Sequence, residues 1–231
     1  MAVLVNDIVE RVQAVLQDTT GVRWPVTSEL LLWINDAQRE LALLKPDATA
    51  STSQVTLDAG TKQGIPSDGN RLLKVVRNVD GSGNGKRSVR LVDGDILDSQ
   101  TPDWHDSAVT GDAQHSTVVK HYIYSEDDPK VYYVYPGVQS GQTVKVEIIY
   151  SKNPDDVTGT GESDYISVAD IYSNAIMNYV LYMAYMKDSE YAGNQQRAST
   201  HYQLFTASVT AKNQLDLITS PNAEAMSSGT V

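Results

Sequence analysis

The chain opens with apolar side chains at the three- and four-residue spacing of an amphipathic helix. This stripe consists of Val5, Ile8, Val9, Val12, Val15 and Leu16. Asp7 and Glu10 have the spacing of a capping box at its start. We expect the helix to end between Asp18 and Gly21, where glycine provides a left-handed terminator.

A second apolar stripe follows Pro25 and predicts a longer helix. Its positions are Leu30, Trp33, Ile34, Ala37, Leu41 and Leu44. Thr27 is the expected N-cap, Glu29 lies in the first turn, and Pro46 ends the helix. Residues 1–50 are therefore expected to form a helical hairpin.

The pattern changes between residues 51 and 152 to short runs of Val, Ile, Thr and Tyr that alternate as strands do. Predicted strands cover residues 54–57, 72–79, 87–92, 118–124, 131–135 and 143–151. Turn-forming residues 126–129 and 137–141 join the last three, which predicts an antiparallel meander. Residues 93–116 are polar and weakly periodic, so we expect an extended loop of functional importance.

Helical spacing returns after a linker at residues 153–163. Ser167 and Asp170 are expected to cap a third helix, whose apolar positions cover more than one face, which is typical of a central helix or one shared between subunits. Asn194 is expected to cap a fourth helix with Ala198, Tyr202, Phe205 and Val209 in its stripe. Residues 219–231 lack an apolar stripe and are expected to form a flexible arm.

These elements predict an α+β fold. Residues 1–50 and 153–218 are expected to form one α-helical bundle from both ends of the chain, and residues 51–152 an inserted antiparallel β-rich module. The arm at residues 219–231 would extend from the bundle.

Composition narrows the function. A net charge of −11 repels DNA phosphates and anionic lipid; a wall that DNA slides past would have this sign, although solubility alone is the simpler explanation. The absence of cysteine excludes disulfides and thiolate metal sites. Neither a basic leader nor a membrane-spanning apolar run is present, so we expect no secretion signal and no membrane contact.

Each motif that resembles a catalytic or ligand-binding site lies in a sequence context that favours another interpretation. Residues 81–86, GSGNGK, resemble a phosphate-binding loop, but a strand-like run follows them instead of a helix, which predicts a hairpin turn. The four histidines have no metal-ligand spacing, and the adjacent carboxylates are typical of turns. We therefore predict no catalytic site, no metal and no cofactor, and hence no enzyme.

Tyrosine is the unusual component, with thirteen residues against one phenylalanine. Its ring provides contact area and its hydroxyl a hydrogen bond, which suits half-solvated interfaces. For the third helix, the interface and the core interpretations are about equally supported.

Three segments resemble the head-to-tail adaptor (connector) proteins of tailed bacteriophages: VQAVLQDTTGVRW, ELLLWINDAQRELALLKPDA and DIYSNAIMNYVLYMAYMKDSEYAGNQQRASTHYQLF. They cover both helical ends but not the β-rich insert. The resemblance implies a homo-oligomeric ring with the portal above, tail or nozzle proteins below, and DNA passing through without sequence-specific binding. It also implies a virion neck protein that assembles in the cytoplasm of the host bacterium.

Several residues are candidates for contacts with other subunits or the portal. Asn35, Asp36, Gln38, Arg39 and Glu40 are expected to form a polar ridge on the second helix, paired with Lys187 and Arg197 of a neighbour. The full set of interface candidates is Trp33, Asp36, Arg39, Glu40, Tyr179, Tyr182, Lys187, Tyr191, Arg197, Tyr202, Leu215, Leu217 and Ile218.

Two alternatives remain at this point. The first is another neck or tail-tube component, which keeps a structural role. A tail-associated carbohydrate-binding or cell-wall-degrading module is the third interpretation, with aromatic strands that stack on sugars.

Overall fold

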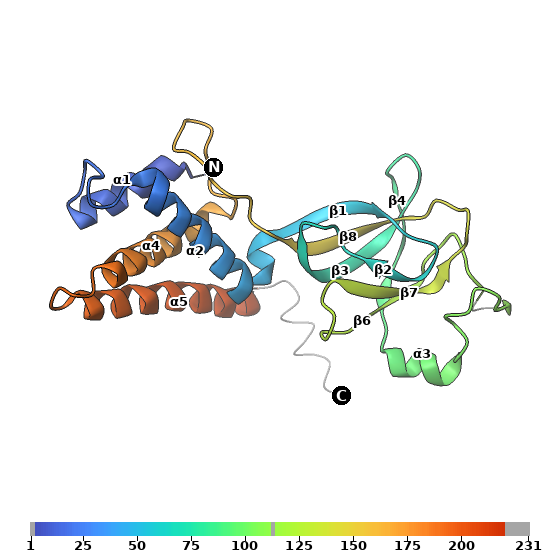
Figure 1. The fold of residues 1–231 in the computed structure, drawn as a ribbon. Helices are drawn as coiled ribbons and strands as arrows, with labels where there is room; N and C mark the ends of the chain where they lie inside the picture. The colour runs from blue at the N-terminus through green and yellow to red at the C-terminus, as the bar shows by residue number, and fades with distance from the viewer. Residues whose placement is uncertain (1–2, 112–113, 220–231) are drawn as a thin grey trace. The chain divides into compact units, whose positions relative to one another are not determined.

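The structure is a computed structural model that describes residues 3–111 and 114–219. It separates into two compact units (Figure 1). The helical unit combines the chain up to Thr49 with the chain from Pro154 onward, and the β unit is Ala50–Asn153. The predicted α+β fold, with helices from both ends of the chain, is confirmed.

The helical unit contains α1 (Val5–Leu16), α2 (Leu31–Leu44), α4 (Ser173–Lys187) and α5 (Asn194–Thr219) (Figure 1). A π-helical turn, Val26–Leu30, precedes α2, and a 3-10 turn, Pro46–Thr49, follows it. A second 3-10 turn, Asp170–Tyr172, precedes α4.

The expected ends of the first helix are wrong. Helix α1 begins at Val5 without a side-chain cap, so Asp7 and Glu10 form no capping box. Gln17, and not Gly21, adopts the left-handed conformation that ends the helix, with φ of 57°. The backbone N–H of that residue bonds back to carbonyls of the last turn, which satisfies them without glycine.

Thr27 and Ser167 also cap no helix. The carbonyl of Pro25 accepts the N–H groups of both Glu29 and Leu30, at 3.1 and 3.3 Å, so the chain enters α2 through a wide π turn. The hydroxyl of Ser167 instead donates to a backbone carbonyl earlier in the chain, and α4 starts only after a 3-10 turn.

One hydrophobic core fills the helical unit. Each helix contributes fully buried side chains, chief among them Ile8, Val12, Leu30, Ile34, Leu41, Ile176, Val180, Leu181 and Phe205. On α4 the buried residues cover more than one face, as predicted, and Tyr179 and Tyr185 are partly buried against the same core. The stripes predicted from three- and four-residue spacing therefore identify most of the buried positions, but Val15, Leu44 and Tyr202 are exposed.

The β unit contains two four-stranded sheets within the described part of the chain. The first has the order β1 (Ala50–Thr56), β8 (Lys145–Lys152), β3 (Gly69–Val79) and β4 (Gly85–Ser88). The second has the order β2 (Gly60–Gly64), β7 (Val131–Val138), β6 (His121–Tyr124) and β5 (Arg90–Leu91). Both sheets contribute to one core that includes Val75, Tyr132, Val134, Val146 and Ile148.

The topology departs from a meander. Strands β6 and β7 pair antiparallel as predicted, but β7 and β8 belong to different sheets, and β5 pairs with β6 in parallel. The sequence also missed β2, a polar strand with alternating buried Thr61 and Gln63. Strand partners are long-range choices that local alternation does not encode.

The segment expected as an extended loop, residues 93–116, contains helix α3 (Gly94–Gln100). Asp93 caps this helix through the N–H of Asp95, at 3.1 Å. Trp104 follows, almost fully buried, with its ring edge-on to Tyr133 and Tyr135 and its indole N–H donated to Asp98 at 2.8 Å. The segment is therefore anchored to β7 by a small core of its own.

Candidate assembly site

The loop between α1 and α2 is organised around the carboxylate of Asp18. It accepts the backbone N–H groups of Val22, Arg23 and Trp24 at 3.1, 2.8 and 2.8 Å. Partial desolvation would raise the pKa of Asp18, but these three hydrogen bonds outweigh it and hold that pKa below its ordinary value. One side chain thus fixes the path of the loop and presents Arg23 and Trp24.

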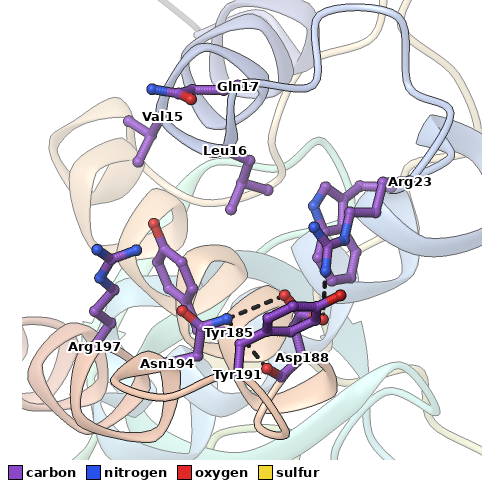
Figure 2. A pocket seen from close by; sticks show the side chains of 10 residues that line it. Val15, Leu16, Gln17, Arg23, Tyr185, Asp188, Tyr191, Asn194 and Arg197 are labelled. Atoms are coloured by element: carbon purple, nitrogen blue, oxygen red, sulfur yellow. Dashed lines mark hydrogen bonds and ion pairs between the residues drawn. The ribbon is translucent and has the colours of Figure 1, made fainter.

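The same loop is held against the turn between α4 and α5. Arg23 donates to the carboxylate of Asp188 at 2.6 Å. Asn194, the first residue of α5, donates its amide to the carbonyl and carboxylate oxygens of Asp188 at 3.1 and 3.0 Å (Figure 2). Arg23 and Asp188 are 165 positions apart in the sequence. Two segments that resemble adaptor proteins therefore meet at one corner of the helical unit.

Aromatic rings and cations surround this corner. The Arg23 guanidinium lies 5.5 Å from the ring centroid of Trp24 and 5.2 Å from that of Tyr191. The Lys187 ammonium lies 5.3 Å from the Trp24 ring and also pairs with Glu29. Such cation–π contacts hold cations beside aromatic rings. We call this arrangement the corner: the α1–α2 loop, residues 17–24, together with the α4–α5 turn and its flanks, residues 185–197.

The corner contains a pocket of about 390 Å³. Figure 2 shows its lining side chains, which include Leu16, Arg23, Tyr185, Tyr191 and Arg197. Tyr191 is 62% exposed. The Arg197 guanidinium lies 5.7 Å from the Tyr185 ring and, among the described residues, forms no ion pair. The pocket is thus open, aromatic and positively charged on one side.

The whole chain was compared with known protein families. A family model described as SU10 adaptor protein matches residues 4–225. The chain belongs to this family. It is a phage adaptor protein, and membership favours a structural role in the virion and association with other head or tail proteins. No curated protein matches the chain significantly.

The polar ridge predicted on α2 is divided in the structure. Asn35 and Gln38 are buried rather than exposed. The Asn35 amide bridges both backbone groups of Val157, at 3.0 and 2.8 Å, and the Gln38 carbonyl accepts the N–H of Ser167 at 2.6 Å. These two side chains hold the incoming C-terminal segment inside the unit. The spacing of Asn35 and Gln38 along the helix could not show that this segment covers their face, so the sequence predicted them as exposed.

The remaining ridge residues are half-buried or exposed. Arg39 pairs with Asp36 at 3.1 Å and with Asp156. Asp36 and Arg39, both predicted to pair with a neighbouring subunit, are therefore already paired within the chain. The structure does not bring the ridge to Lys187 or Arg197 of the same chain.

Three tyrosines predicted at an interface form an aromatic stack on α4 and α5. The Tyr182 ring centroid lies 5.7 Å from Tyr179 and 5.0 Å from Tyr202, and Phe205 lies 5.2 Å from Tyr179. Burial, followed by the charges of Glu40 and Asp36, raises the pKa of Tyr179 to about 12. The stack therefore reaches from the core to the surface.

Beside the stack, the Nδ1–H group of His201 donates a hydrogen bond to the side-chain oxygen of Asn178 at 2.9 Å, and the His201 ring stacks on Tyr185. Burial lowers the pKa of His201.

The other predicted residues lie outside the corner, although Trp33 contacts one of its residues. Trp33 packs on Trp24, with ring centroids 5.9 Å apart. Leu215 is 57% exposed on α5. Leu217 and Ile218 belong to α5, but their side chains lie outside the described residues, as does the predicted arm beyond Thr219.

Sequence reasoning missed the residues that build the corner. Asp18 was read only as part of a helix end, although an Asp shortly before glycine is a common organiser of turns. The partnership of Arg23 and Asp188 has no local signal, since it joins opposite ends of the chain.

No group of three His, Asp or Glu residues is arranged to hold a metal ion within residues 3–111 and 114–219. Across the same residues, no helix combines the length and apolar character needed to span a membrane.

Proposed function

We propose that this chain is a head-to-tail adaptor subunit that forms a homo-oligomeric ring between the portal and the tail, around the DNA channel. The observation that carries the proposal is the corner, an exposed aromatic and cationic pocket built by the segments that resemble adaptor proteins. Interfaces are anchored by aromatic and arginine side chains in such pockets. The ring would belong to the virion neck and assemble in the host cytoplasm.

A ring requires two different surfaces on each subunit, one of which receives the other. Arg197 is exposed at the corner and has no ion pair among the described residues. Glu40 lies on α2, half-buried, and forms no ion pair within the described chain either. We assign Glu40 of one subunit as the partner of Arg197 on the next, with Tyr191 and the Tyr179–Tyr182–Tyr202 stack supplying contact area.

The charge of the helical unit fits a ring around DNA. It carries seven Lys or Arg against sixteen Asp or Glu. A negative wall repels DNA phosphates, so DNA would pass without sequence-specific binding.

The test measures ring formation on the portal protein of the same phage by mass photometry and electron microscopy. We expect wild-type protein to form a ring of many copies on the portal, and the double variant Tyr191→Ala/Arg197→Ala to bind at least tenfold more weakly. Interface anchors of these types commonly cost 2 kcal/mol or more each when truncated, roughly a thirtyfold loss of affinity.

The matched control is Tyr165→Ala/Arg11→Ala, which removes one exposed tyrosine and one arginine from elsewhere in the helical unit. It should assemble as wild type does. Persistent monomer for the wild-type protein in the presence of portal would contradict the ring. Cross-links to tail proteins and never to the portal would support another neck or tail-tube position.

A further inference from the structure

Positive charge is distributed unevenly between the two units. The β unit carries eleven Lys or Arg against thirteen Asp or Glu, so it is nearly neutral in a chain whose net charge is −11. Within it, several basic side chains gather at one place, where β4, β5 and the start of β6 lie together.

These side chains line a concave pocket of about 290 Å³. Its lining consists of Arg87, Ser88, Arg90, Lys120 and His121. Every one of these side chains can donate a hydrogen bond, and none is a carboxylate.

A buried amide fixes the backbone beneath the pocket. Asn78 donates to the carbonyls of Arg87 and Val119 at 2.9 and 2.7 Å, and accepts the N–H of Val119 at 2.9 Å. Val89 and Val119 point into the core, so their neighbours Arg90 and Lys120 are directed outward. The basic side chains are therefore held on a rigid frame.

Backbone hydrogen bonds also hold β5 beside the start of β6. The N–H of Arg90 donates to the carbonyl of Lys120 at 3.2 Å, and Arg90 lies beside His121 in the parallel register. Lys120 in turn donates its N–H to Tyr135 at 2.8 Å, and the His121 ring stacks on Tyr135 with centroids 6.2 Å apart.

The pocket cations differ from four other basic residues of the same unit. Acidic partners neutralise Arg71, Arg77, Lys86 and Lys152, at 3.9, 3.0, 3.2 and 4.0 Å. Arg87, Arg90 and Lys120 form no ion pair with any residue that the structure describes.

The pKa of His121 also reflects the unpaired cations of the pocket. Burial, followed by the charges of Arg87, Arg90 and Lys120, lowers the pKa of His121 below its ordinary value. The imidazole therefore lies in a positive field that no carboxylate offsets.

We propose that this pocket binds a phosphate group. A phosphate oxyanion accepts hydrogen bonds on several oxygens in different directions, which matches two guanidinium groups, an ammonium, a hydroxyl and an imidazole around one concavity. A single carboxylate is planar and would satisfy only one arginine fork. The source is either a nucleic-acid backbone or free phosphate, and recognition of either carries no base-sequence information. This assignment does not depend on the ring.

The experiment uses the full chain and three probes: inorganic phosphate, a fluorescent 20-base-pair DNA, and polyglutamate of matched charge. The pocket variant is Arg87→Gln/Arg90→Gln/Lys120→Gln. The control, Lys62→Gln/Lys74→Gln/Lys130→Gln, removes the same charge from exposed positions of the same unit outside the pocket.

We expect the pocket variant to lose at least tenfold in affinity for phosphate or DNA, and the control to lose less than threefold. For DNA, the slope of log K against log salt should fall by about 2–3 in the pocket variant, since each phosphate contact contributes about 0.9. Binding of DNA without inorganic phosphate would identify the backbone as the source, and the reverse would identify free phosphate.

A second readout does not depend on the variants. In wild-type protein, saturating inorganic phosphate or DNA should raise the pKa of His121, measured by NMR, because the anion offsets the three cations. His201 in the helical unit should not change. Equal losses in both variants, equal affinity for polyglutamate, an unchanged His121, or no binding of any probe would each overturn the proposal.

Discussion

Two clusters of positive charge, one in each unit, are held in opposite ways. At the corner of the helical unit, Arg23 and Lys187 are paired with Asp188 and Glu29, and they join two distant segments of the chain. In the β unit, Arg87, Arg90 and Lys120 are held on a rigid frame and pair with no described carboxylate. The difference separates charges that build the fold from charges that are available to a ligand.

Each unit also has its own core, so damage to one core should remain local. Phe205→Ala should destabilise the helical unit by about 3–5 kcal/mol, and Ile148→Ala the β unit by about 2–5 kcal/mol, because both side chains are fully buried. Hydrogen exchange followed by mass spectrometry would locate each loss. Equal loss of protection in both units from either variant would show that the units unfold together.

A smaller effect distinguishes buried from exposed polar residues of α2. Asn35→Ala should cost roughly 2–4 kcal/mol of unfolding free energy, because it leaves two buried backbone groups of Val157 unpaired. Arg39→Ala removes only solvent-exposed ion pairs and should cost about 0–1 kcal/mol. Urea denaturation measures both. Similar losses of unfolding free energy in the two variants would show that the hydrogen bonds between Asn35 and Val157 do not stabilise the helical unit.

The β unit should tolerate the loss of one buried hydroxyl. The Tyr132 side chain is fully buried, and its hydroxyl has no hydrogen-bond partner among the described residues. Tyr132→Phe should therefore leave the unfolding free energy within about 1 kcal/mol of wild type or increase it. A clear loss of stability in thermal denaturation would reveal a partner for this hydroxyl.

The smallest expected effects concern the loss of stability at acidic pH. Hydrogen bonds lower the pKa of Asp18 in the helical unit, and those from Asn84 lower the pKa of Asp80 in the β unit to about 2. A lowered folded-state pKa stabilises the protein above the ordinary Asp pKa near ~4, and this contribution is lost as pH falls through the folded-state value.

Asp18→Asn should therefore reduce the acid sensitivity of the helical unit below pH ~4, and Asp80→Asn that of the β unit, with a small loss of stability at pH 7. Thermal melts between pH 2 and 7, with hydrogen exchange to assign the unit, provide the measurement. An unchanged pH profile in both variants would contradict the role of these carboxylates.

The sequence predicted the helical unit better than the β unit, for a physical reason. Apolar spacing along a helix is local, so the stripe through Ile8 and Val12 and the one through Leu30 and Leu41 identified the buried faces. Strand partners are chosen over long distances, so the parallel pairing of Arg90 with His121 and the separation of β7 from β8 had no local signal.

The candidate site was predictable only in part. Lys187, Tyr191 and Arg197 belong to a recognisable segment and lie at one corner, while their role at an interface stays a prediction. Asp18 and the Arg23–Asp188 pair were not found, because the hydrogen bonds that define them depend on the folded chain. The same is true of Asn35, whose polar side chain predicted an exposed position but is buried.

The central claim is that Arg197 of one subunit meets Glu40 of the next in a ring on the portal. Charge exchange tests it most directly. Arg197→Glu and Glu40→Arg should each prevent ring formation on the portal in mass photometry, and the double variant Arg197→Glu/Glu40→Arg should restore it, because the pair is re-formed with reversed charges. Rings formed by both single variants as readily as by the wild type, or a double variant as defective as the worse single variant, would contradict the account.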